Sequence, residues 1–207
     1  MQDQIPHIVY ISPEFYSKGE IEKDLEVLKG TDLNIYVQQN ENNPLFNAFE
    51  WIIPSAFGVY ILKPYFDSIL SEVGKDHYEL LKKFISQYLK KGKKFNFSLI
   101  AAKESSKKLS KTYNNSLTVA LEIQAKNNRV IKILFDNSLS IEEWQEASSK
   151  IMDLFVEHYR KSPEDVLTKA MNRFEDKPHR KLYIIINKRF QNIEIKDDND
   201  LVEIYKK

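Results

Sequence analysis

The chain has 207 residues, a formal net charge of +1, 42% hydrophobic residues and no cysteine. The absence of cysteine excludes disulfides, thiolate zinc sites and cysteine nucleophiles, and it is typical of a cytoplasmic protein. The apolar residues are numerous enough to form a sizeable core, which argues against a disordered chain. We therefore expect a single domain over residues 1–207, with a subdivision near residue 94 as the alternative.

The first forty residues predict a β-α-β unit. His7–Ile11 has the β-branched, apolar character of a strand, and Ser17 begins a capping-box pattern in front of a helix over Lys18–Lys29. We expect this helix to stop at Gly30, which accepts a left-handed backbone. The strand Leu33–Val37 follows, and we expect the two strands to pair in parallel through a right-handed crossover.

The segment Trp51–Phe66, WIIPSAFGVYILKPYF, holds the most concentrated apolar surface of the chain. We expect it to be helical, with a kink or a restart at Pro64. Gly74 would end this helix, and a second helix over residues 76–91 would close at Gly92. The sequence thus predicts a central pair of apolar helices.

This apolar segment is too short to cross a membrane. Its uncharged run has 12 residues, whereas a membrane-spanning helix needs about 20. A helix that is apolar all round is usually buried, so core packing competes with a docking surface for a second protein chain. The candidate interface residues are Trp51, Phe57, Tyr60, Tyr65 and Phe66.

Three charged residues flank or interrupt the same segment and are candidates for ligand binding. They are Glu50, Lys63 and Asp67. If they faced a pocket, they would orient a polar ligand. Because Lys63 and Asp67 are four residues apart, the alternative is a surface ion pair of small energetic value.

The second half of the chain predicts a β-hairpin, further helices and C-terminal strands. In chain order we expect a strand Phe95–Ala102, a polar loop Lys103–Ser116, a strand Leu117–Lys126, a hairpin turn at Asn127 and Asn128, a strand over 129–136, a helix capped by Ser140, a helix capped by Ser162, a strand over 181–186 and a tail with two short strands. The strand Leu117–Lys126 alternates, so we expect Glu122 on a solvated face. Together these elements predict an α+β fold with a single mixed sheet packed by several helices.

Lysine residues are concentrated in the middle of the chain. Between Lys82 and Lys111 there are ten lysines and one acid, Glu104, so this segment carries +9 in a chain of +1. The interpretations are plain solvation, an acidic protein partner, or the phosphates of nucleic acid or a nucleotide. The candidate residues are Lys90, Lys91, Lys93, Lys94, Lys107, Lys108 and Lys111.

Motifs for catalysis are weak. The four histidines lack the spacing of metal ligands, and the chain has neither a phosphate-binding loop nor a hydrolase elbow, so we expect no metal and no cofactor. The element order over residues 77–188 resembles that of the restriction-type nuclease core. That core needs an acid on its second strand and E-x-K on its third. Glu122 meets the first requirement, but Lys132 has no acid two residues before it.

The most favoured function is therefore non-enzymatic. We expect a cytoplasmic protein that binds another protein chain, in a hetero- or homo-oligomer, within a larger assembly. The alternative is a nucleic-acid or nucleotide binder that uses the lysine-rich segment 82–111. The third interpretation is a nuclease-like enzyme whose residues are dispersed along the chain.

Overall fold

We analysed the protein in a computed structural model. The structure describes residues 5–40, 57–69, 74–94, 115–116, 119–177, 181–188 and 194–205. Five predicted site residues lie outside these ranges, namely Glu50, Trp51, Lys107, Lys108 and Lys111. The predicted strand Phe95–Ala102 and nearly all of the loop Lys103–Ser116 also lie outside them.

The described strands form one seven-stranded sheet in the order β2-β1-β3-β4-β5-β6-β7. Their bounds are β1 Ile8–Pro13, β2 Ile35–Asn40, β3 Phe57–Ile61, β4 Val119–Gln124, β5 Val130–Phe135, β6 Leu182–Ile186 and β7 Ile195–Lys196. Three neighbouring pairs are parallel, namely β1–β2, β3–β4 and β5–β6, and the other three are antiparallel. The predicted α+β fold with a single mixed sheet is confirmed.

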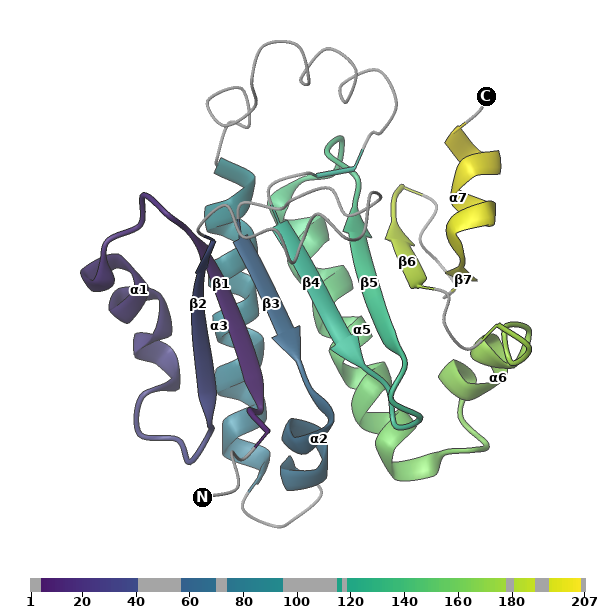
Figure 1. The fold of residues 1–207 in the computed structure, drawn as a ribbon, viewed down its shortest axis with the longest axis horizontal. Coiled ribbons are helices and arrows are strands. Elements are labelled where there is room, and N and C mark those ends of the chain that lie inside the picture. Colours follow the sequence, from purple (N-terminus) through teal and green to yellow (C-terminus); the bar gives the residue numbers. More distant parts are fainter. Residues whose placement is uncertain are drawn as a thin grey trace.

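Helical segments connect the strands of each parallel pair, as such pairs require. The helical segments are α1 Lys18–Leu25, the 3-10 turn η1 Glu26–Leu28, α2 Lys63–Ile69, α3 Gly74–Lys94, α5 Ile141–Lys161, α6 Val166–Asn172 and α7 Asp198–Tyr205. In Figure 1, α3 and α5 lie behind the sheet, and α6 and α7 lie beside β6 and β7. No helix in the described ranges is long and apolar enough to cross a membrane.

The predicted β-α-β unit at the start of the chain is confirmed, and its local signals are all in place. Ser17 Oγ accepts a hydrogen bond from the Glu20 N–H at 3.3 Å, and the Glu20 carboxylate accepts one from the Ser17 N–H at 2.8 Å. Gly30 has a φ of +82°, the left-handed backbone that ends a helix. β1 and β2 then pair in parallel.

The helix predicted over Trp51–Phe66 is wrong in its described part. Phe57–Ile61 is the strand β3, and α2 begins only at Lys63, with Pro64 in its first turn. β3 lies between β1 and β4, so both of its edges are paired, and four of its five residues are buried, which fits its apolar sequence. Periodicity alone does not separate such a strand from a buried helix.

Both glycines expected to end the central helices have other positions. Gly74 begins α3, and Gly92 lies inside it, because α3 continues to Lys94. A Cβ at position 92 would meet Val119 Cγ1 at 1.9 Å. Gly92 thus allows α3 to approach β4 closely and does not end the helix.

The core lies between the sheet and the helices α3 and α5. Ser140 caps α5 as predicted, with its side chain and that of Glu143 bonded reciprocally. Aromatic rings from α2 and α5 stack in this layer, with the centroids of Phe66 and Tyr159 4.5 Å apart. Burial of this kind is the main favourable term in the stability of the fold.

The β4–β5 hairpin turns where predicted, since Asn128 has a φ of 66°. The solvated face expected for β4 is wrong, because Glu122 is only 4% exposed.

Two later expectations also need correction. Asp165, and not Ser162, caps α6. The last predicted strand is the helix α7, and Asp197 and Asp200 form a reciprocal cap at its start.

Candidate functional site

The aromatic interface candidates that the structure describes lie mostly in the core. Phe57, Tyr65 and Phe66 are at most 1% exposed, and the Tyr88 hydroxyl donates a hydrogen bond to the Phe57 carbonyl at 2.9 Å. Tyr60 points to the opposite face of the sheet and is half-buried. The three buried rings are enclosed by their own chain and are therefore not available to a second one.

The charged pair near the apolar segment forms a surface ion pair. Lys63 Nζ lies 2.6 Å from Asp67 Oδ2 within α2, and the two side chains are 36% and 48% exposed. Such a pair contributes little to stability. This geometry corresponds to the ion-pair alternative, and Glu50, the third candidate, lies outside the described residues.

Two of the candidate lysines at the end of α3 make contacts within the chain. Lys91 Nζ lies 2.6 Å from Asp24 Oδ1, and it sits 4.2 Å from the centroid of the Tyr16 ring. Lys93 Nζ lies 4.0 Å from the Trp144 ring and donates to the Leu139 carbonyl at 2.6 Å. These contacts use the charge of both lysines for packing.

Lys90 and Lys94 differ from those two lysines because both are exposed. Both lie near the end of α3. Together with Lys83 they make three exposed lysines in the described part of the lysine-rich segment, which is fewer than its sequence indicated.

The outer edge of β2 is the first feature that can bind a partner. β2 is the outermost strand on its side of the sheet, and among the described residues only β1 pairs with it (Figure 1). Its residues, IYVQQN, include no charge and no proline. Tyr36 is 56% exposed and Val37 is 38% exposed. An outer strand of this length usually carries a charge or a proline that prevents pairing.

The hydrogen bonds between β1 and β2 show which backbone N–H and C=O groups of β2 point away from β1. The Ile8 N–H donates to the Asn34 carbonyl at 3.3 Å, so the groups of Asn34 point toward β1. Because these directions alternate along a parallel strand, the N–H and C=O groups of Ile35, Val37 and Gln39 point away from β1. The N–H and C=O groups in this position can hydrogen-bond to a strand of another polypeptide.

An exposed aromatic ring lies beside this edge. Gln39 Nε2 donates to the Tyr16 carbonyl at 2.7 Å, which holds the turn after β1 against β2. Phe15 is in that turn and is 60% exposed. Sequence reasoning missed this surface, because nothing in the local sequence shows that β2 is an outer strand.

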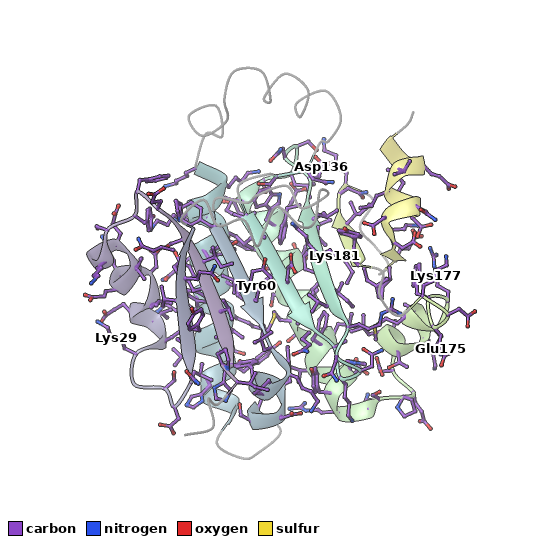
Figure 2. The ribbon with its side chains drawn as sticks, viewed as in Figure 1. Lys29, Tyr60, Asp136, Glu175, Lys177 and Lys181 are labelled. Carbon is purple, nitrogen blue, oxygen red and sulfur yellow. The ribbon has the colours of Figure 1, made fainter. Side chains whose placement is uncertain are left out.

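A second feature, the Glu122 cluster, consists of Glu122, Lys132 and Lys181 on the face of the sheet opposite α3 and α5. Glu122 of β4 and Lys132 of β5 are directly opposite each other in the register, and Tyr60 and Tyr183 extend the same row on β3 and β6. Figure 2 labels Tyr60 and Lys181 on this face, at two sides of the row. None of the described helices crosses this face in Figure 1.

The ionic contacts in the Glu122 cluster are loose. Glu122 Oε1 lies 3.2 Å from Lys181 Nζ and 3.9 Å from Lys132 Nζ. This buried oxygen has no hydrogen-bond partner in the described part of the chain. Burial lowers the pKa of Lys132, the Glu122 charge raises it and the Lys181 charge lowers it further. Burial, and then the Glu122 charge, raise the pKa of Tyr60.

A third group, the His158 cluster, consists of His158, Asp165 and Thr168. The Lys126 N–H donates to His158 Nε2 at 3.1 Å, so Nδ1 carries the ring hydrogen and faces Asp165 Oδ1 at 3.0 Å. The Thr168 N–H and hydroxyl donate to the two Asp165 oxygens at 2.9 and 2.6 Å. His158 is 1% exposed, so this cluster joins α5, α6 and the hairpin and has no access to a substrate.

For the nuclease interpretation, the described residues bring Glu122 opposite Lys132 but do not place the second required carboxylate two residues before that lysine. Glu122 lies opposite Lys132, but the residue two before that lysine is Val130. In the ranges that the structure describes, no group of three or more His, Cys, Asp or Glu side chains is arranged to hold a metal. This interpretation therefore stays a prediction.

Comparison of the chain with protein-family models, with curated proteins and with solved structures finds no match. Any functional inference has to come from the arrangement of the chain's own residues.

Proposed function

We propose that the protein is a non-enzymatic binding protein that pairs the free edge of β2 with a strand of a second polypeptide. The carrying observation is a six-residue outer strand with no charged side chain, whose outer edge no other described strand pairs. The proposal places this function in the cytoplasm, for which the support is the cysteine-free sequence.

The energetic reason is that no other described strand pairs with this edge of β2. Strand addition would give partners to the outward groups of Ile35, Val37 and Gln39. It would also cover the exposed side chains of Tyr36 and Val37, and apolar burial is the main driving force of association. Phe15 would extend the covered area beyond the end of the strand.

The occupant that we propose is β2 of a second copy of the chain. Antiparallel pairing about a two-fold axis places identical strands opposite each other. For most strands this brings like charges together, which is unfavourable, but the sequence IYVQQN carries none. The nearby helix α1 has acids and lysines interspersed, so two copies would not meet with a large charge of one sign.

The test measures self-association of the full chain by sedimentation equilibrium. We expect the wild type to dimerise with rising concentration and Val37→Lys to weaken dimerisation by about tenfold or more, equivalent to about 1.4 kcal/mol. Val202→Lys on α7 is the matched control, because Val202 is 37% exposed and Val37 is 38% exposed. α7 lies at the opposite side of the sheet in Figure 1.

Hydrogen exchange locates the contact in the same samples. Protection of β2 amides should rise with protein concentration in the wild type and in Val202→Lys, but not in Val37→Lys. A wild type that stays monomeric at the highest soluble concentration would refute the proposal. So would a dimer that both lysine variants weaken equally.

A further inference from the structure

The Glu122 cluster contains more positive than negative charge in a buried place. It has one carboxylate and two ammonium groups, and Glu122 and Lys132 are 4% and 7% exposed. The next lysine along the row, Lys196, has its own partner in Glu194 at 2.7 Å. Uncompensated buried charge is strongly unfavourable. Among the described residues, the cluster therefore has one positive charge in excess, shared between the buried Lys132 and the partly exposed Lys181.

The polar atoms of the cluster also lack hydrogen bonds. The Lys132 ammonium has three donors, but its ion-pair partner, Glu122 Oε1, is 3.9 Å away, beyond hydrogen-bond distance. Within the described part of the chain, Glu122 Oε1 has no hydrogen-bond partner at all. Buried polar groups in native proteins are nearly always bonded, and each exception needs an explanation.

We propose that the Glu122 cluster binds a small oxyanion, the carboxylate or phosphate group of a small molecule, between Lys132 and Lys181. Such a group supplies a compensating negative charge and accepts hydrogen bonds from both ammonium groups. A hydroxyl on the same molecule would donate to Glu122 Oε1. The Tyr60 hydroxyl, in the same cross-strand row, is a further donor to the ligand.

The burial of the cluster selects a small ligand. Polymer phosphates need exposed cations along a surface, whereas Lys132 is 7% exposed. Lys181 is more accessible, with 26% of its side chain exposed, and Tyr60 is half-buried. These two residues are the more exposed members of the site, and a small anion would reach Lys132 past them. None of the residues of this site is on β2, so the site is independent of pairing at the β2 edge.

The test compares inorganic phosphate and succinate with chloride at equal ionic strength, using thermal unfolding and calorimetric titration of the full chain. We expect at least one of the two oxyanions to raise the melting temperature of the wild type and to bind with measurable heat. A response to phosphate alone identifies a phosphate group, and a response to succinate alone identifies a carboxylate. A short oligonucleotide should produce no response.

Variants identify the site. Lys132→Met should weaken binding by about 10- to 100-fold, because it removes a charged donor. Lys150→Met is the control, since Lys150 pairs with Glu146 on the exposed side of α5. Glu122→Gln should tighten binding of these simple anions, because it removes a repelling carboxylate. If Lys132→Met does not fold, Lys181→Gln tests the same point with the same expected loss.

Two results would overturn the proposal. One is that neither oxyanion changes the wild type beyond the effect of chloride. The other is that Lys132→Met, or Lys181→Gln in its place, binds the anion as tightly as the wild type and Lys150→Met do.

Discussion

Two buried groups of charged side chains, the His158 cluster and the Glu122 cluster, differ in whether their hydrogen bonds are made. In the His158 cluster, the hydrogen bonds of the Asp165 carboxylate are between 2.6 and 3.0 Å, and both ring nitrogens of His158 have partners. In the Glu122 cluster the ion-pair distances are 3.2 and 3.9 Å, and one carboxylate oxygen is unbonded. Burial of charge is thus common to both, and of these two groups of described residues only the second contains a buried side-chain oxygen without a hydrogen bond.

The comparison also separates two uses of buried charge. The His158 cluster joins elements that are far apart in the sequence, since it connects the hairpin at Lys126 to α5 and α6. A complete network of this kind stabilises one arrangement of the chain. The Glu122 cluster joins β4 to β5, which the backbone already pairs, and it also links β4 to Lys181, just before β6. It contains fewer hydrogen bonds than the His158 cluster, so we expect its side chains to contribute less to holding the elements together.

The largest expected effect is at Asp165. Asp165→Ala leaves the His158 Nδ1–H and the Thr168 N–H without their acceptor, and it removes the cap of α6. We expect a loss of about 3 kcal/mol in the free energy of unfolding, measured with urea. Asp153→Ala is the control, because Asp153 is 57% exposed on α5 and should cost less than about 1 kcal/mol. Equal losses would show that the network has no special role.

In the Glu122 cluster, removal of the negative charge should lower the free energy of unfolding, and removal of one positive charge should not. Glu122→Gln leaves two neighbouring ammonium groups without a carboxylate, and we expect a loss of about 1–3 kcal/mol. Lys132→Met removes the excess charge and keeps most of the side-chain volume, so it should be neutral or stabilise by about 1 kcal/mol. Both are measured in chloride buffer without oxyanions. A large loss in Lys132→Met would mean that this lysine serves the fold and not a ligand.

The smallest expected effect is the dependence of the free energy of unfolding on the ionisation of Asp165 at acid pH. Burial alone would raise the pKa of Asp165, but hydrogen bonds from Thr168 and His158 outweigh it and lower the pKa below the ordinary value of 3.8. As pH falls, the Asp165 carboxyl is therefore protonated at a higher pH in the unfolded chain than in the native state. The free energy of unfolding decreases as pH falls for this reason. The contribution is complete above the unfolded pKa and is lost as pH passes below about 4 through the native pKa.

Urea unfolding from pH 6 down to pH 3 measures this contribution, and Asp165→Asn is the comparison. The wild type should lose more stability over this interval than the variant, which has no carboxyl to titrate at this position. Parallel curves would show that the hydrogen bonds of Asp165 do not depend on its charge.

Local signals in the sequence were sufficient wherever a structure is formed by residues a few positions apart. The capping boxes begun by Ser17 and Ser140, the left-handed Gly30 and the hairpin turn at Asn128 are all where they were predicted. Each depends on hydrogen bonds or backbone angles within about four residues, so the sequence by itself determines it. The β-α-β start and the mixed sheet follow from these boundaries.

Tertiary structure decided everything that depends on which surfaces meet. Phe57–Ile61 is a strand because β1 and β4 flank it, and Gly92 lies inside α3 because Val119 is so close to it. β2 became an outer strand through the order of pairing, which no local pattern encodes. Glu122 was expected on a solvated face, yet it is buried beside Lys181, a residue 59 positions away in the chain. Alternation shows which side chains share a face, but only the packed chain determines what each face meets.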